Sequence, residues 1–103
     1  MPHLFVDAAA AVEIQRGAVV SKVVHRDEHL EVTVFGFDAG QGLTEHTASR
    51  EAVVEVLSGR LRLTVDGEDL DGGPGCWLHM AGGTPHSLEA LEPTVMLLTL
   101  VRP

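Results

Sequence analysis

Residues 75–86 read GCWLHMAGGTPH and give the most specific indication of the fold. A short run rich in large apolar side chains lies between two glycine-containing turns, which is typical of a β-strand, and His86 follows the second turn. Residues 40–59, GQGLTEHTASREAVVEVLSG, follow the same plan and place His46 just after a glycine-rich turn. Strands of a β-barrel point alternate side chains inward. We therefore expect His46 and His86 to meet inside one mouth of a barrel.

Two-residue alternation dominates the rest of the chain. It is clearest in the stretch HLEVTVFGF, where Leu30, Val32 and Val34 share one face and the residues between them share the other. Strands recurring at this spacing favour an all-β sandwich or barrel, and only residues 8–14 have a helical pattern. We expect one all-β domain over residues 1–103. The predicted strands, separated by turn-forming residues, are 19–25, 29–37, 52–57, 60–66, 76–80 and 94–101.

Length and composition exclude several classes of protein. The 103 residues suit one domain, and 7 Lys and Arg against 15 Asp and Glu give a net charge of −8. That balance disfavours nucleic acid and anionic membranes as partners. No apolar run approaches the roughly 20 residues of a membrane helix, and the first residues lack the pattern of a signal peptide. Cys76 is the single cysteine, so no internal disulfide forms and a cytoplasmic location is expected.

The two stretches that contain glycine and histidine resemble the two motifs of the cupin family. The first family motif is G-x5-H-x-H-x3-E-x6-G, and the second is G-x5-P-x-G-x2-H-x3-N. Over residues 37–90 the chain therefore resembles a small single-domain cupin. The resemblance implies an all-β, double-stranded β-helix, which is the cupin jelly-roll barrel. The matching positions are Gly40, His46 and Gly59 in the first motif and Gly75, Gly83 and His86 in the second.

The chain departs from these motifs at four positions. In the family, two histidines and a glutamate of the first motif and the histidine of the second bind a divalent transition metal. Only His46 and His86 match those four ligands, and two imidazoles are fewer than the three or four protein ligands of a typical site. The departures are Ala48 for the second histidine, Ala52 for the glutamate, Ala81 for the proline and Ala90 for the asparagine.

Two nearby side chains are predicted to complete the metal site. Glu51 lies one residue before the glutamate position, where a β-bulge would turn it inward. His79 lies on the predicted strand between the two turns of the second motif. The first hypothesis is therefore that His46 and His86, with Glu51 or His79, bind a divalent transition metal (Zn, Fe, Mn or Ni) that polarises a small substrate.

Two further hypotheses stay open. In one, the barrel is a metal-free small-molecule binding module in which His46, His86 and Trp77 orient the ligand. In the other, the chain is a structural or regulatory homodimer, because residues 95–101 are apolar on both strand faces. Cupins catalyse many different reactions, so the resemblance leaves open whether the chain is an enzyme and which small molecule it takes.

Residues 25–29, HRDEH, match the H-x-x-E-H pattern of one class of metallopeptidase. That chemistry needs a helix, which places both imidazoles on one face. Strand-like sequences lie on both sides of the pattern, so we expect a hairpin with a solvated histidine at each end.

Overall fold

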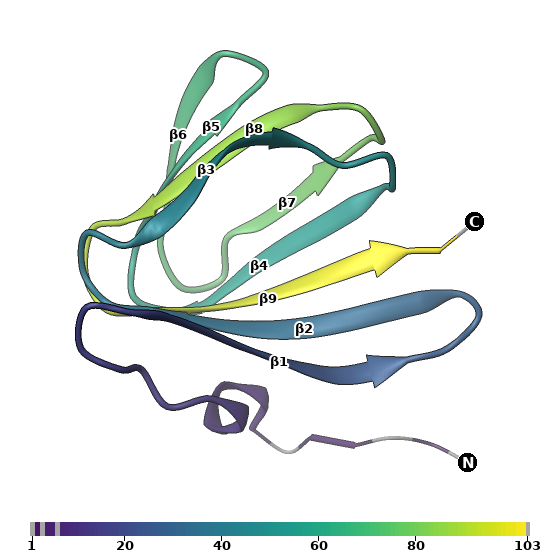
Figure 1. Cartoon of the computed structure of the whole chain (residues 1–103), viewed down its shortest axis with the longest axis horizontal. Coiled ribbons are helices and arrows are strands. Elements are labelled where there is room, and N and C mark those ends of the chain that lie inside the picture. The colour runs from purple at the N-terminus through teal and green to yellow at the C-terminus, as the bar shows by residue number, and fades with distance from the viewer. Residues whose placement is uncertain (1, 3, 6, 103) are drawn as a thin grey trace.

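The computed structural model describes residues 2, 4, 5 and 7–102. In this part of the chain, two antiparallel sheets face each other (Figure 1). One sheet has the strand order β1-β2-β9-β4-β7 and the other has the order β3-β8-β5-β6. The all-β jelly-roll prediction is confirmed. The strands are β1 (Val19–Arg26), β2 (Leu30–Phe37), β3 (Gly42–Thr47), β4 (Ala52–Ser58), β5 (Leu61–Val65), β6 (Glu68–Gly72), β7 (Trp77–Met80), β8 (Pro85–Ala90) and β9 (Thr94–Val101).

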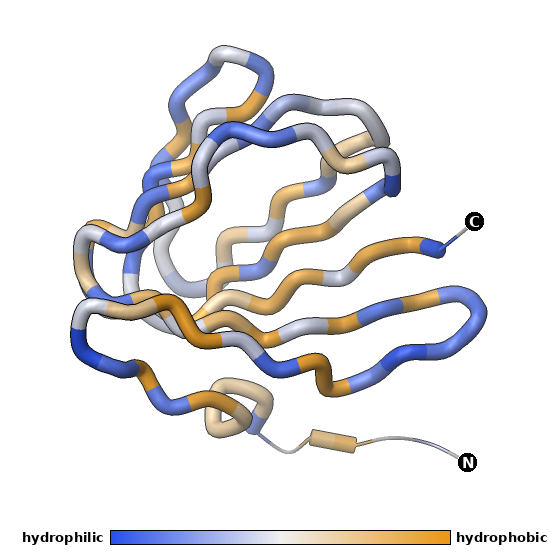
Figure 2. The backbone as a smooth tube through the Cα atoms, viewed as in Figure 1, coloured by the Kyte–Doolittle hydropathy of each residue, from blue (hydrophilic) through white to orange (hydrophobic). Residues whose placement is uncertain are grey.

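The hydrophobic core fills the space between the two sheets. Alternation along the strands, visible in Figure 2, sends one set of side chains inward. On β4 the inward residues Ala52, Val54 and Val56 are all buried. They pack against residues of the facing sheet, of which Leu61 and Leu63 are among the most buried. The barrel is therefore closed by side chains over much of its length.

A segment before β1 covers part of the outer face of the five-stranded sheet. It contains a short 3₁₀ helix, η1 (Ala8–Ala11). This helix lies within residues 8–14, the stretch whose sequence has a helical pattern. Val34 is fully buried but lies outside the core cluster, because it points to this outer face. A Cβ atom at Gly36 would lie 3.2 Å from the Ile14 side chain and 3.3 Å from Val12. The N-terminal segment thus packs closely on the sheet.

The pattern HRDEH forms a hairpin, as predicted. Strand β1 ends at Arg26 and β2 begins at Leu30. Asp27 organises the turn, since its carboxylate accepts hydrogen bonds from the backbone N–H groups of His29 and Leu30 and lies 2.6 Å from Nε2 of His25. These bonds, led by the one to His25, hold the pKa of the Asp27 carboxyl well below its usual range.

Strand β9 lies in the middle of the five-stranded sheet, between β2 and β4. Its inward residue Met96 belongs to the core, and its outward residue Leu97 lines a hollow together with Phe5 and Ala8. The apolar character of both faces therefore has an explanation within the chain, because the N-terminal segment covers part of the outer face. No helix of the described residues is long and apolar enough to cross a membrane.

Candidate functional site

His46 and His86 lie next to each other at the open end of the barrel. They are direct cross-strand partners on β3 and β8. Their ring centroids are 4.2 Å apart, with an angle of 63° between the ring planes. Both rings point inward, because His86 is also paired with Val65, which shares a face of β5 with the buried Leu63.

A β-bulge brings His46 to the inner face. Leu43 pairs with Leu88 and His46 pairs with His86, so three steps along β3 match two steps along β8. Without the extra residue, alternation would place Leu43 and His46 on opposite faces of the sheet. The bulge lets both side chains face the interior.

Backbone carbonyl groups fix the orientation of both rings. Nδ1 of His46 lies 2.8 Å from the carbonyl oxygen of Thr44, and Nδ1 of His86 lies 2.9 Å from that of Thr84. A carbonyl oxygen only accepts hydrogen bonds, so Nδ1 carries the proton in each neutral ring. Each Nε2 atom then has a free lone pair, and no hydrogen bond to either atom is present among the described residues.

Strand β2 carries an inward-facing charged group that the sequence analysis missed. Glu31, on the inner face of β2, accepts a hydrogen bond from Nε of Arg26 at 2.6 Å. An Nη atom of Arg50 lies 4.0 Å from the other carboxylate oxygen. The two-residue alternation of β2 could have revealed this inward-facing carboxylate. Glu31 shares its strand face with Phe35, which packs against the core.

Glu51 and His79 pair with each other away from the barrel interior. Their side chains are 2.6 Å apart, between Oε2 and Nε2. Because Ala52 points inward, its neighbour Glu51 points outward, and His79 is aligned with the outward residue Val53. The structure therefore does not bring either predicted third ligand to His46 and His86.

Trp77 also lies on this outer surface, contrary to its predicted place in the pocket wall. It is 62% exposed and is aligned across the strands with Glu55. Its ring stacks with that of His79, with centroids 6.4 Å apart and an angle of 16° between the planes. Strand β7 starts one residue later than predicted, and its alternation turns Trp77 and His79 outward together.

The donor atoms at the open end do not fit a transition-metal site. Among the described residues, no group of three or more His, Cys, Asp and Glu side chains is arranged to hold an ion. Ala52, at the family's glutamate position, is buried and supplies no donor. Two imidazole nitrogens alone fall short of the three or four protein ligands that such metals require.

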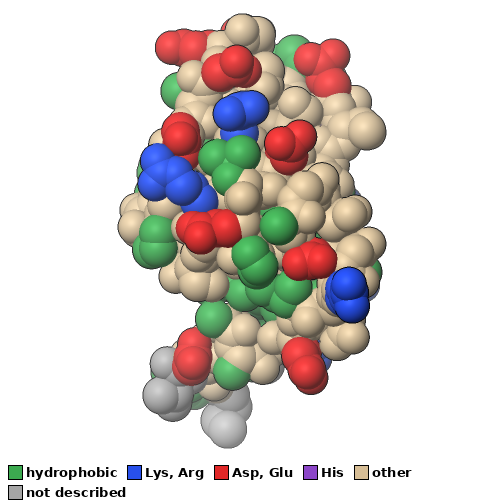
Figure 3. Space-filling view, turned by 90° about the vertical axis from the view of Figure 1, so that its left-hand side faces the viewer, with side chains coloured by type: hydrophobic (Ala, Val, Ile, Leu, Met, Phe, Trp, Pro, Cys, Tyr) green, Lys and Arg blue, Asp and Glu red, His purple; other side chains and the backbone are tan. Residues whose placement is uncertain are grey.

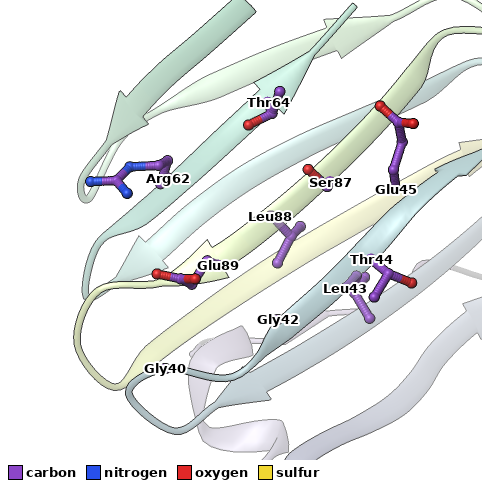
Figure 4. Close-up of a pocket in the computed structure, with 10 residues that line it drawn as sticks. All are labelled: Gly40, Gly42, Leu43, Thr44, Glu45, Arg62, Thr64, Ser87, Leu88 and Glu89. Carbon is purple, nitrogen blue, oxygen red and sulfur yellow. The ribbon is translucent and has the colours of Figure 1, made fainter. Parts of the chain in front are cut away.

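A separate hollow lies on the outer face of the four-stranded sheet (Figure 4). Its cavity volume is about 470 Å³, and its polar side chains include Arg62, Thr64, Ser87 and Glu89. Alternation places these residues on the side opposite Leu63 and Leu88, so the hollow does not open into the barrel.

The end of the molecule away from the histidines carries scattered acidic side chains, and no described histidine is visible on it (Figure 3).

The fold and the site together, a jelly-roll barrel with two paired histidines at one end, are those of a cupin-type protein. The family model described as "Cupin domain" matches residues 33–101, and the chain belongs to the cupin family. Cupins commonly bind small molecules or transition metals. No curated protein is similar enough to count as a match.

Several solved structures share the fold. A conserved protein of unknown function from Streptococcus pyogenes is 33% identical, with a TM-score of 0.87 over 100% of this chain and 91% of that one. A cupin 2 conserved barrel domain protein from Leptotrichia buccalis is 35% identical, with a TM-score of 0.85 over 91% of this chain and 46% of that one. A cupin superfamily protein from Desulfitobacterium hafniense is 19% identical, with a TM-score of 0.88 over 93% and 88%.

Proposed function

We propose that this cupin is a small-molecule binding module that works without a metal, with His46 and His86 as the groups that orient the ligand. The observation that carries the proposal is the pair of rings 4.2 Å apart, each held by a carbonyl group through Nδ1. Two acceptor Nε2 atoms in fixed positions suit a ligand with neighbouring O–H or N–H donors. Because the core fills the space between the sheets, the ligand would lie against the two rings at the open end and not within the barrel.

The test is a thermal-shift screen of small polyhydroxy and amide compounds, done in the presence of a chelator. A compound that binds the native state raises Tm, by an amount that grows with the ratio of its concentration to Kd. We expect His46→Ala and His86→Ala to abolish the shift. His79→Ala is the matched control, since it removes a histidine from the outer surface, away from His46 and His86.

Metal analysis of the same protein, prepared without a histidine tag, separates this proposal from the metal hypothesis. One equivalent of Zn, Fe, Mn or Ni that is lost in His46→Ala and His86→Ala would overturn the metal-free reading. Ligand shifts that persist in both variants would overturn the role of the histidines.

The exposed Trp77 favours a homodimer as a second part of the proposal. Large aromatic side chains are enriched where proteins meet, and Trp77 stacks with His79 on an edge strand. Sedimentation of the chain should show a dimer that dissociates in Trp77→Ala but not in Leu4→Ala, which removes another exposed apolar side chain. A single 11.0 kDa species at all concentrations would contradict it.

A further inference from the structure

Arg50 and Arg102 form a shared wall between two hollows at the open end of the barrel. One hollow has a volume of about 590 Å³, and its other lining residues are Glu28 and His29. The second has a volume of about 600 Å³, and its other lining residues are Ser49, Glu51 and Val101. The Glu51 carboxylate is 2.6 Å from Nε2 of His79. Figure 1 shows the β1–β2 hairpin, the end of β9 and the start of β4 together at this end.

Carboxylates lie near the two arginines, but none makes a close ion pair with either guanidinium in the described residues. The carboxylate contact of Arg50 is to Glu31 at 4.0 Å, and Glu31 is already bonded to Arg26 at 2.6 Å. Arg102 makes no ion pair with a carboxylate of the described residues, and its Nη1 atom donates to the Asp27 carbonyl at 3.0 Å. Neither guanidinium is therefore closely paired with a carboxylate of the described residues.

The backbone around the arginines is held in place before any ligand arrives. The N–H of Arg102 donates to the His29 carbonyl at 2.7 Å, and that of Val101 donates to the Glu51 carbonyl at 2.9 Å. The Asp27 carboxylate fixes the hairpin turn that carries His29. A backbone that is already ordered loses less entropy on binding.

We propose that Arg50 and Arg102 bind a small multivalent oxyanion, with His29 as an additional hydrogen-bond donor. Guanidinium groups match the oxygen pairs of phosphates and carboxylates. Glu28 faces the same hollow and opposes the anion, so it weakens the binding. Neither His46 nor His86 lines these hollows, and the proposal is independent of the one for the barrel interior.

The test is a titration followed by NMR of the backbone amides, with inorganic phosphate in one arm and succinate in the other. Sodium chloride at matched ionic strength corrects for screening. We expect saturable shifts at the amides of His29, Arg50 and Arg102. Arg50→Gln and Arg102→Gln should each weaken binding about tenfold, as for a lost hydrogen bond to a charged group.

Two variants distinguish binding at this site from a general charge effect. Glu28→Gln should tighten binding, since it removes the opposing carboxylate. Arg62→Gln removes one positive charge from the outer face of the other sheet and should leave the affinity unchanged. The anion that binds with the lower Kd, phosphate or succinate, shows which class of oxyanion the site prefers. Absence of saturation in both arms, or equal binding by Arg50→Gln and the native chain in spectra that show both folded, would overturn the proposal.

Discussion

At the residue scale, Gly59 illustrates how a motif position is tied to backbone geometry. Its φ is +85°, and a Cβ atom there would lie 2.3 Å from the Pro93 carbonyl oxygen and 2.6 Å from Thr94 Cα. Gly67 has a similar φ of +81° but has no atom within 4 Å of the same position. The first glycine is therefore required by both conformation and space, and the second by conformation alone.

Gly59→Ala should be more destabilising than Gly67→Ala. The positive φ costs each variant about 1 kcal/mol, and overlap with backbone atoms adds roughly 1–3 kcal/mol at Gly59 only. Urea unfolding of both variants measures the difference. Equal losses would show that the chain around Pro93 moves aside freely.

The buried hydroxyl of Thr94 supplies a second prediction at this scale. It accepts from the Arg60 N–H at 2.9 Å and donates to the Glu92 carbonyl at 2.8 Å. Thr94→Val keeps the shape but leaves a part-buried N–H without its partner, and should cost about 1–3 kcal/mol. Thr99→Val, on the same strand, is the control and should change the free energy of unfolding little. A loss at Thr94 no larger than at Thr99 would contradict the prediction.

At the element scale, Asp38 connects the start of β1 to the turn after β2. Its carboxylate accepts from the Gly17 N–H at 2.6 Å and from the Ala39 N–H at 2.9 Å. These two bonds, the first being the stronger, lower the pKa of the Asp38 carboxyl from its ordinary value. A carboxyl with a lower pKa in the folded chain stabilises the fold above its unfolded-state pKa, and this stabilisation disappears as pH falls through the folded-state pKa.

Asp38→Asn should therefore lower Tm at neutral pH, and the gap to the native chain should close as pH falls below about 4. Thermal unfolding from pH 7 to pH 2 measures it. Glu68→Gln, which removes a carboxylate without a hydrogen bond in the described residues, should not change the profile. A gap for Asp38→Asn that stays constant with pH would mean that its ionisation does not contribute.

The elements that sequence analysis missed share a physical reason. Strands β3, β6 and β8 are polar or begin at proline. They lack both the alternation and the runs of large apolar or β-branched residues that mark the six predicted strands. In β3, the bulge between Leu43 and His46 breaks the two-residue period. Strand β6 is an edge strand with few inward side chains. Pairing with neighbours, and not local sequence, makes these segments strands.

At the scale of the whole molecule, the sequence was enough to predict the fold, but it predicted the positions of the candidate ligand-binding groups only in part. The glycines and histidines of the two motifs are close in sequence to the turns that position them, so their spacing predicts that His46 and His86 meet. The β3–β8 pairing and the bulge that complete this arrangement are not visible in the spacing. The direction of Glu51, His79 and Trp77 depends on strand register, which the chain sets through long-range pairing. The cluster of Arg50 and Arg102 arises from the meeting of distant segments, which no spacing pattern records.

The N-terminal segment supplies the last prediction, because it completes the burial of the five-stranded sheet. Removal of residues 2–14 would expose Val34 and Val95, which are buried but lie outside the core cluster. Exposure of one such side chain costs about 1.5–3 kcal/mol, so Tm should fall and the truncated chain should bind a hydrophobic dye. Removal of residues 2–5 alone keeps η1 and should have little effect. An unchanged Tm for the longer deletion would mean that the sheet is stable with its outer face in water.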